Sequence, residues 1–311
     1  MSSNKPPLIL ILGPTAVGKT EISVQLAEKL NGEIISADSR LFYRGMDIGT
    51  AKPTREELSR VPHHLIDIAE PDQTLSLQIF QESARSTIAR IHADGHIPFL
   101  VGGTGQYLRS VTEGWLPPEV MPNPRLRNVL EKMGKKNGSL WLHDNLTQVD
   151  PDAAENIDPR NLRRVIRAFE VIFSSGIKFS DQRKRGDPAY WITSVGLTRP
   201  RDVLYRRIDA RIELMFANGL MDEVKGLLEK GYSPDLPSMT AIGYRECIMV
   251  INGMLSIDQA KTQMKRVTRK FVRRQANWFK ENNTEIKWFD LETSRVEVIE
   301  EFIRNSLPLG A

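Results

Sequence analysis

The sequence contains a single cysteine, Cys247, among 311 residues. One cysteine excludes a disulfide-stapled scaffold and a zinc site built from several cysteines, and it fits a reducing compartment. Long hydrophobic runs are also missing, since the apolar run over 8–12 is far shorter than the ~20 residues that cross a bilayer. That run continues directly into Gly13 and Pro14 without a small-residue cleavage site. We therefore predict a cytoplasmic protein with no signal peptide and no membrane segment.

Neither sign of charge dominates the sequence. Lys and Arg number 43 and Asp and Glu number 39, which gives a formal net charge of only +4. A hydrophobic fraction of 40% and a charged fraction of 26% are ordinary for a globular protein and exclude a disordered or collagenous chain. The adjacent residues His63 and His64 have no Cys or His set around them, so we predict a structural role for them and not a metal site.

Short apolar segments alternate with amphipathic ones in the first third of the chain. Residues 8–12 (LILIL), 33–37 (EIISA) and 97–101 (IPFLV) are short apolar runs bounded by turns, which predicts buried strands. Residues 18–30 and 77–91 carry apolar side chains at three- and four-residue spacing, which predicts helices. The order strand, helix, strand, helix, strand indicates a doubly wound parallel sheet of the α/β class.

This alternation stops at Gly114. Residues 116–124 contain four prolines, as a linker does. Helical patterns follow over 124–133, 140–144 and 161–173. The next predicted strand is 191–197, and two further helical stretches are predicted over 202–230 and 256–282. We therefore predict a doubly wound α/β core over 1–114 and 189–311, with a basic helical C-terminal part and a helical insertion domain over 115–188.

A phosphate-binding motif follows the first predicted strand. Residues 13–20 read GPTAVGKT, a full match to G-x4-G-K-T between a strand and a helix. The backbone N–H groups of such a loop converge on phosphate oxygens, and the following helix directs its positive end at them. Lys19 adds a full charge, and the Thr20 hydroxyl is placed to ligate Mg²⁺. The motif predicts that the core is P-loop NTPase-like. It also predicts diphosphate binding by Gly13, Pro14, Thr15, Ala16, Val17, Gly18, Lys19 and Thr20.

Polar residues follow the next two predicted strands. Asp38 comes directly after the strand over 33–37, where a carboxylate acts as a general base or holds Mg²⁺, or else caps a turn. Thr104 follows the strand over 97–101 within a Gly-Gly-Thr sequence, which fits either a phosphate contact or a tight turn into a helix. Ligands of doubly wound sheets bind outside the carboxyl ends of the strands, which favours the functional interpretation of both residues.

Positive charge is concentrated in a few segments. Residues 261–280 contain eight Lys and Arg residues and no acid, with Met264, Val267, Phe271, Gln275 and Trp278 spaced as a packed stripe. We predict that the positive residues form an exposed face that suits a polyanion, the alternative being an ordinary solvated face. Two smaller clusters are Arg160, Arg163, Arg164 and Arg167, and residues 183–185.

With these motifs in place, the chain resembles the bacterial tRNA dimethylallyltransferases, also called tRNA isopentenyltransferases. The matching stretches occur in the family's order and cover nearly the whole chain. They are GPTAVGKT (13–20), ISADSRLFYRGMDIGTAKPT (35–54), PHHLIDI (62–68), LVGGTGQYL (100–108), DPDAA (150–154), RRVIRAFEV (163–171), GLTRPRDVLYRRIDARIELMFANGLMDEV (196–224), TAIGYRE (240–246) and RRQANWF (273–279).

The resemblance implies a reaction. The family transfers a dimethylallyl group from dimethylallyl diphosphate to N6 of the adenosine at tRNA position 37, in tRNAs that read codons beginning with U. It implies that the phosphate loop holds the diphosphate of an isoprenoid, with Mg²⁺ as cofactor. The exocyclic amine attacks C1 of the dimethylallyl group, and the adenosine leaves the anticodon-loop stack to reach the site.

The resemblance also implies roles for single residues. Asp38 would be the general base, Thr104 would orient the amine or the leaving group, and Arg127 is a further catalytic candidate. Arg211, in the stretch RIDAR (207–211), would bind diphosphate. The implied partners are the tRNA anticodon stem-loop and dimethylallyl diphosphate, with the protein acting as a monomer.

The implied tRNA contacts lie in four segments. The insertion segment departs from the family's usual His-Pro-Asn-Asp-Pro version by reading IDPRNLRRVIR, so its contacts are the least defined. The implied contact residues are Asp38, Ser39, Arg40, Leu41, Arg163, Arg164, Val165, Ile166, Arg167, Thr240, Gly243, Tyr244, Arg245, Arg273, Arg274 and Gln275.

Two other functions share part of this pattern. A small-molecule or nucleoside kinase would have the same phosphate loop and strand-end carboxylate, but it does not require the basic segment 261–280. A non-catalytic RNA-binding module with a nucleotide switch would need the basic segment but not Asp38 and Thr104 beside the loop. Transfer of phosphate from ATP, or RNA binding without any transfer, would favour one of these alternatives.

Overall fold

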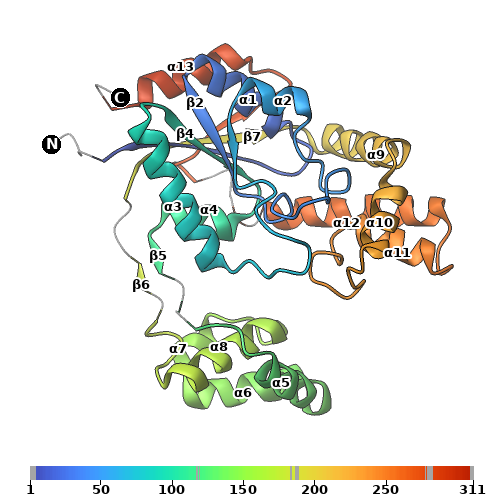
Figure 1. Cartoon of the computed structure of the whole chain (residues 1–311). Coiled ribbons are helices and arrows are strands. Elements are labelled where there is room, and N and C mark those ends of the chain that lie inside the picture. The colour runs from blue at the N-terminus through green and yellow to red at the C-terminus, as the bar shows by residue number, and fades with distance from the viewer. Residues whose placement is uncertain are drawn as a thin grey trace. The chain divides into compact units, whose positions relative to one another are not determined.

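The computed structural model describes residues 5–116, 118, 120–182, 184–185, 189–276, 278 and 283–308. The chain forms two compact units, one from Met1–Thr112 with Pro188–Ala311 and one from Glu113–Asp187 (Figure 1). The first unit consists of two separate stretches of sequence, and the second unit is the segment inserted between them. Each unit is described by itself below.

The first unit is built on one parallel sheet. Within the described residues, its strands follow the order β3-β2-β4-β1-β7-β8 and every neighbouring pair is parallel. The strands are β1 (Pro7–Leu12), β2 (Gly32–Ser36), β3 (His63–His64), β4 (Ile97–Gly102), β7 (Trp191–Thr198) and β8 (Lys287–Asp290). The predicted parallel α/β sheet is confirmed. His63 and His64 form an edge strand that the sequence analysis missed.

The alternation of side chains along β1 explains its central position. Ile9 and Ile11 belong to one buried cluster, and Leu8, Leu10 and Leu12 belong to another, so both faces of the strand are covered. Helices α1 (Lys19–Lys29) and α13 (Val296–Ser306) pack on one face of the sheet, and α3 (Leu77–Ala93) and α4 (Gly105–Thr112) pack on the other (Figure 1). A short helix, α2 (Arg55–Arg60), packs against α1.

Four helices of the C-terminal part pack against one another. They are α9 (Arg201–Ala217), α10 (Leu220–Glu229), α11 (Tyr244–Ile251) and α12 (Ile257–Gln275). The helical stretch predicted over 202–230 is confirmed, and Gly219 at φ 93° divides it into α9 and α10. The helix predicted over 256–282 begins as expected, but α12 ends at Gln275, and most of the remaining predicted residues lie outside the described residues.

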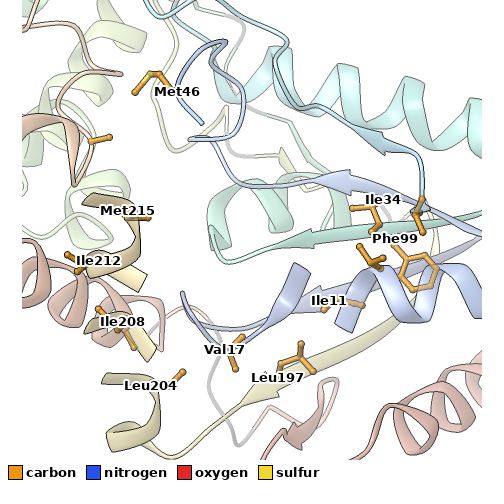
Figure 2. Close-up of a cluster of buried hydrophobic side chains, with 14 of the residues drawn as sticks. Ile11, Val17, Ile34, Met46, Phe99, Leu197, Leu204, Ile208, Ile212 and Met215 are labelled. Carbon is orange, nitrogen blue, oxygen red and sulfur yellow. The ribbon is translucent and has the colours of Figure 1, made fainter. Parts of the chain in front are cut away.

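One buried cluster joins this helical layer to the sheet. Leu204, Ile208, Ile212 and Met215 follow one another along α9 at three- and four-residue spacing, and all are buried. They share a cluster with residues of the sheet and the phosphate loop, including Ile11, Val17 and Leu197 (Figure 2). The core of the first unit therefore reaches from the sheet to α9 directly beside the phosphate loop.

The second unit is mainly helical. It contains α5 (Pro124–Asn137), α6 (Ser139–Val149), α7 (Pro151–Glu155) and α8 (Leu162–Ser175), with the short antiparallel pair β5 (Trp115–Leu116) and β6 (Lys184–Arg185). Its own cluster of buried residues, which includes Leu146, Val165 and Phe169, comes from these helices. In the part of the chain that the structure describes, each helix of either unit is too short or too polar to cross a bilayer.

Candidate active site

The carboxyl ends of β1, β2 and β4 border a cavity of about 780 Å³. The cavity is lined by residues that follow each of these strands and by residues of α9 and α12. Its volume is within the range of small-molecule sites. The predicted site residues that line it are Thr15, Ala16, Gly18, Lys19, Thr20, Asp38, Ser39, Arg40, Leu41, Thr104, Arg211, Thr240, Arg274 and Gln275.

The phosphate loop connects β1 to α1 and has an unusual backbone. Ala16 has φ 67° and Gly18 has φ 110°, both in the region that L-residues other than glycine rarely adopt. Lys19 begins α1, and its ammonium Nζ donates to Gly13 O (3.0 Å) and Pro14 O (2.9 Å). The loop therefore presents Lys19 and the N-terminus of α1, the two positive features that a diphosphate needs.

Lys19 is partly buried, and its charge is sensitive to pH for that reason. Burial lowers the pKa of Lys19 from 10.5 to about 8. Asp38 opposes this shift as a nearby negative charge, while Arg211 adds to it as a nearby positive charge. The charges of Asp38 and Arg211, which line the same cavity, therefore both act on Lys19.

Asp38 lies two residues beyond β2 and is partly exposed to the cavity. Its Oδ1 accepts a hydrogen bond from Arg40 N (3.0 Å), so the residue does cap the turn that follows the strand. Among the described residues no hydrogen bond or ion pair to Oδ2 is found. The two interpretations of Asp38 are therefore compatible, because one carboxylate oxygen orders the turn and the other is available to a ligand.

Thr104 immediately precedes α4 and lines the cavity. The preceding residue, Gly103, allows a close approach, since a Cβ there would lie 2.5 Å from Gln275 Nε2 and 3.0 Å from Gly13 O. The end of β4 therefore comes directly against the phosphate loop. A larger residue at position 103 would separate Thr104 from Lys19 and the rest of the loop.

Gln275, the last residue of α12, links these two segments. Its Oε1 accepts from Thr15 N (2.9 Å) and its Nε2 donates to Gly103 O (3.2 Å), and the side chain is buried. The sequence analysis predicted Gln275 as a tRNA contact, and the structure gives it contacts to the loop and to the end of β4. The basic helix α12 therefore ends on the phosphate loop itself.

Two arginines of α9 face the cavity. Arg211 Nη2 donates to Thr50 O (3.4 Å), and burial lowers the pKa of Arg211, an effect that Asp38 opposes and Arg207 increases. Arg207 lies four residues earlier and therefore on the same side of the helix, and its Nε donates to Ala16 O (2.7 Å). The sequence analysis missed Arg207, although its spacing from Arg211 within RIDAR could have indicated it.

Apolar side chains line another part of the cavity. Met264 is buried, whereas Phe271 and Trp278 are each 38% exposed. The predicted packed stripe of α12 is therefore wrong in part, because its buried residues are Ala260, Met264, Val272 and Gln275. The exposed aromatic rings give the cavity an apolar surface next to its charged one.

The arrangement fits a magnesium ion bound together with a ligand. In the described part of the chain, no group of three or more His, Cys, Asp or Glu residues could hold a metal by itself. Mg²⁺ usually takes one or two protein oxygens and completes its shell with phosphate oxygens and waters. The Thr20 hydroxyl and the Asp38 carboxylate, which line the same cavity, supply such oxygens.

Comparisons with known proteins decide the family. A family model described as IPP transferase matches residues 41–282, and one described as isopentenyl transferase matches residues 6–73. A tRNA dimethylallyltransferase of Roseiflexus sp. (strain RS-1) is 52% identical over 274 residues, which are 88% of this chain and 90% of that protein. One of Thermomicrobium roseum is 44% identical over 306 residues, or 98% and 93% of the two chains. The chain belongs to the tRNA dimethylallyltransferase family.

Solved structures agree with this assignment. A tRNA isopentenylpyrophosphate transferase from Bacillus halodurans is 42% identical and covers 97% of each chain, with a TM-score of 0.73. A eukaryotic dimethylallyltransferase acting on tRNA has a TM-score of 0.82 at 26% identity and covers 98% of this chain and 81% of that one. The P-loop NTPase-like fold of the tRNA dimethylallyltransferases is therefore the fold of this chain as well.

The basic helix α12 has two different sides. Lys261 and Lys265 both bind Glu213 of α9 at 2.6 Å, and Arg269 binds Asp209 at 2.5 Å. The prediction that all the positive residues form an exposed face is therefore wrong for these three, and Lys280 lies outside the described residues. The exposed residues without an ion pair in the described part of the chain are Arg266, Lys270, Arg273 and Arg274. Their four- and three-residue spacing places them on one side of α12, which we call the free basic face.

Tyr244 cannot serve as the predicted tRNA contact in this structure. It is fully buried, and its hydroxyl donates to Glu223 Oε1 (2.5 Å). Glu223 also accepts from the backbone N–H groups of residues 47, 48 and 49, so it holds the loop that continues into the cavity at Thr50. Among the neighbouring candidates, Thr240 is exposed, Gly243 precedes α11, and Arg245 pairs with Glu246.

The predicted tRNA contacts in the second unit are also partly buried and partly exposed. Val165 and Ile166 are buried in its core, so they offer no surface to tRNA in this structure. Arg163 and Arg164 are exposed, whereas Arg167 donates to Glu170 and to Val120 O (2.8 Å). Arg183 of the third basic cluster lies outside the described residues.

Proposed function

We propose that this protein transfers the dimethylallyl group of dimethylallyl diphosphate to N6 of the adenosine at tRNA position 37, next to the anticodon, in tRNAs that read codons beginning with U. The observation that carries the proposal is one cavity that joins Lys19 and Thr20 of the phosphate loop to Asp38 and Thr104, in a chain of this family. The product would be N6-dimethylallyladenosine. We further propose that the protein works as a monomer in the cytoplasm.

The reaction forms a bond between N6 and C1 of the dimethylallyl group and breaks the bond between C1 and the diphosphate oxygen. Asp38 accepts the proton that the amine loses, since its Oδ2 is available in the cavity while Oδ1 remains bound to Arg40 N. Thr104, at the end of the neighbouring strand, orients the amine or the leaving oxygen through its hydroxyl.

Negative charge grows on the diphosphate as it leaves. Lys19, Arg211 and the backbone N–H groups of Gly18, Lys19 and Thr20 are positive groups at this place in the cavity. Mg²⁺ bound through Thr20 would neutralise further charge on the leaving oxygens. The catalytic role of Arg127 stays a prediction. In this structure its guanidinium binds Glu170 within the second unit.

A flipped adenine needs an apolar surface and a backbone anchor. Phe271 and Trp278 line the cavity with partly exposed rings, which suit stacking on a base. The free basic face of α12 leads to this point, and Arg274 belongs to both the face and the cavity lining. We therefore assign the tRNA backbone to the free basic face, together with residues 39–41, Thr240, Arg163 and Arg164, whereas Asp38 would meet the adenosine itself.

The decisive experiment is incubation of the purified protein with Mg²⁺, dimethylallyl diphosphate and unmodified tRNA, followed by mass analysis of the tRNA nucleosides. We expect N6-dimethylallyladenosine at position 37. Absence of that product together with phosphate transfer from ATP would replace the proposal with the kinase alternative. RNA binding without either reaction would favour a binding module.

Asp38→Asn tests the general base with little change in shape. The amide oxygen can still accept from Arg40 N, but the side chain no longer takes up a proton. We expect the transfer rate to fall about 10²- to 10⁴-fold while tRNA affinity stays within about twofold. Glu56→Gln, at an exposed carboxylate outside the cavity, is the matched control and should behave as wild type. A loss of tRNA affinity in Asp38→Asn as large as its loss of transfer rate would contradict the assignment of Asp38 as the general base.

A further inference from the structure

The carbonyl groups of the phosphate loop are held by cationic side chains. Lys19 holds Gly13 O and Pro14 O. Arg207 Nε donates to Ala16 O (2.7 Å), and Arg199 Nε donates to Val17 O (2.9 Å). Only Lys19 belongs to the loop motif, whereas the two arginines follow the second unit in the sequence. The hydrogen bonds of the arginines are charge-assisted and therefore stronger than ordinary ones.

Holding these carbonyls has a consequence for the amide groups. A trans peptide unit is planar, and its C=O and N–H point in opposite directions. Val17 O shares its peptide unit with the N–H of Gly18, so a hydrogen bond to Val17 O on the outside of the loop turns that N–H to the opposite side. The N–H of Val17, which shares its peptide unit with Ala16 O, donates to Pro14 O (3.4 Å) within the loop. A phosphate loop binds anions through its N–H groups, so the orientation of its carbonyls decides how well it binds.

The backbone between the two arginines needs this support. Ala16 has a positive φ of 67° and is not a glycine, so the conformation must be maintained by its surroundings. Both arginines lie close to Gly18 as well, because a Cβ at Gly18 would be 3.8 Å from Arg207 Nη2 and 4.0 Å from Arg199 Nη2. Two guanidinium groups therefore enclose the turn from Ala16 to Gly18.

Arg199 occupies a place from which it acts only through the loop. It follows β7 directly, its side chain is 17% exposed, and it is not part of the cavity lining. Its Nη1 forms an ion pair with Glu292, which lies just beyond β8. Glu292 thus fixes the direction of the guanidinium that binds Val17 O. Arg207 is similar but also lines the cavity, so Arg199 gives the cleaner test.

We propose that Arg199, oriented by Glu292, is a positioning residue that together with Arg207 holds the phosphate loop in its diphosphate-binding conformation through Val17 O and Ala16 O. The inference rests on the proposed function, since it assigns the loop to a diphosphate. Arg199 touches neither the substrate nor the reacting atoms. Its removal leaves Lys19, Thr20 and Asp38 in place but releases the backbone that arranges the N–H groups.

The test compares Arg199→Gln, Arg199→Lys and Glu292→Gln with the control Arg201→Gln, an exposed arginine at the start of α9. Calorimetry with inorganic diphosphate and Mg²⁺ gives loop affinity, and steady-state kinetics gives KM for dimethylallyl diphosphate and kcat. We expect Arg199→Gln to weaken diphosphate binding and raise KM about ten- to a hundredfold, with tRNA affinity unchanged. Arg199→Lys should recover part of the loss, because an ammonium still donates to Val17 O.

A double-variant cycle checks the role of Glu292. Glu292→Gln should weaken diphosphate binding less than Arg199→Gln, and it should add nothing when Arg199 is already Gln, because both act through one contact. Additive effects, an equal loss in Arg201→Gln, or a loss confined to kcat with normal diphosphate affinity would each overturn the proposal. If Arg199→Gln does not fold, Arg199→Lys and Glu292→Gln provide the same comparison.

The readouts separate this inference from the proposed function. Wild-type protein that binds diphosphate but makes no N6-dimethylallyladenosine would contradict the proposed function and leave the role of Arg199 intact. Wild-type protein that makes the product, with Arg199→Gln equal to it in diphosphate affinity, would contradict the role of Arg199 alone.

Discussion

Cationic side chains are used in opposite ways at two places, the phosphate loop of the first unit and Glu170 of the second unit. Around the phosphate loop, Lys19 and Arg207 bind main-chain carbonyls, which are polar but carry no charge. In the second unit, Arg127 binds both oxygens of Glu170 and Arg167 binds its Oε2, and this carboxylate has no exposed surface. The first arrangement leaves positive charge available for an anionic ligand, whereas the second neutralises it within the protein. Whether a lysine or arginine binds a carbonyl or a carboxylate therefore indicates whether its charge is available to a ligand.

The largest expected effect concerns the second arrangement. Glu170→Ala leaves Arg127 and Arg167 without their common partner and exposes a buried space, so the second unit should lose about 3–5 kcal/mol of unfolding free energy. Chemical denaturation followed by circular dichroism measures this. Glu155→Ala, at an exposed position of α7, is the control and should change stability little. Unchanged stability of Glu170→Ala would show that the pairing of Glu170 with the two arginines does not stabilise the second unit.

The same carboxylate should make the second unit sensitive to acid. Burial alone would raise the pKa of Glu170, but hydrogen bonds from Arg127, Asn123 N and Arg167 outweigh it and lower the pKa below its ordinary value of 4.5. The stabilisation by Glu170 is therefore present above about pH 4.5 and is lost as pH falls through the lower folded-state pKa.

The next largest effect concerns Lys19. Lys19→Ala removes a cation that forms no ion pair within the described residues, so the rate of transfer should fall about 10²- to 10³-fold. Thermal stability should change little, because the ammonium binds only loop carbonyls. Lys29→Ala, at the other end of α1 and outside the cavity, is the control for activity. A large loss of stability with normal activity would show that Lys19 has a structural role, as Arg127 has in its pair with Glu170.

The pH dependence of Lys19 sharpens the comparison further. Its pKa of about 8 means that the ammonium loses its proton as pH rises from 7 to 9, so kcat/KM for dimethylallyl diphosphate should fall up to tenfold per unit above pH 8. The effect on stability has the opposite sign. The pKa in the folded state is below the unfolded value of 10.5, so burial of the charge destabilises the protein below pH 8, and this penalty disappears as pH rises toward 10.5.

Lys19→Met provides the reference for both measurements. The variant has no group that titrates at this place, so its pH profile of diphosphate binding should be flatter than that of wild type. The difference in unfolding free energy between the two proteins should change between pH 8 and 10.5 in favour of wild type. Parallel profiles for the two proteins would contradict the assignment of this pKa to Lys19.

The smallest expected effect compares two sides of one helix. Lys270→Gln and Arg273→Gln change residues of the free basic face, so each should reduce the slope of log tRNA affinity against log salt by about 1. Lys261→Gln changes a residue that Glu213 already neutralises and should alter the slope much less. Salt titrations of tRNA binding measure all three. Equal changes would show that pairing within the protein does not separate the two sides of α12.

The sequence analysis succeeded where the signal is local. The phosphate loop and Asp38 could be predicted because a motif and a strand end are defined by neighbouring residues. The side chains that hold the loop could not, because Arg199 and Gln275 reach it only through tertiary packing. The same limit explains Phe271, which the spacing placed in a packed stripe although it lines the cavity. Apolar character alone does not distinguish a core residue from one that faces a ligand.

The phosphate loop and the side chains that hold it are far apart in the chain. Arg199, Arg207 and Gln275 bind residues that precede them by 182, 191 and 260 positions, and the whole second unit lies between. During synthesis the N-terminal residues emerge first, so the second unit is complete before β7 and α9 exist. A nascent chain that ends before β7 therefore contains the entire phosphate-loop motif but none of the guanidinium groups that arrange it for binding.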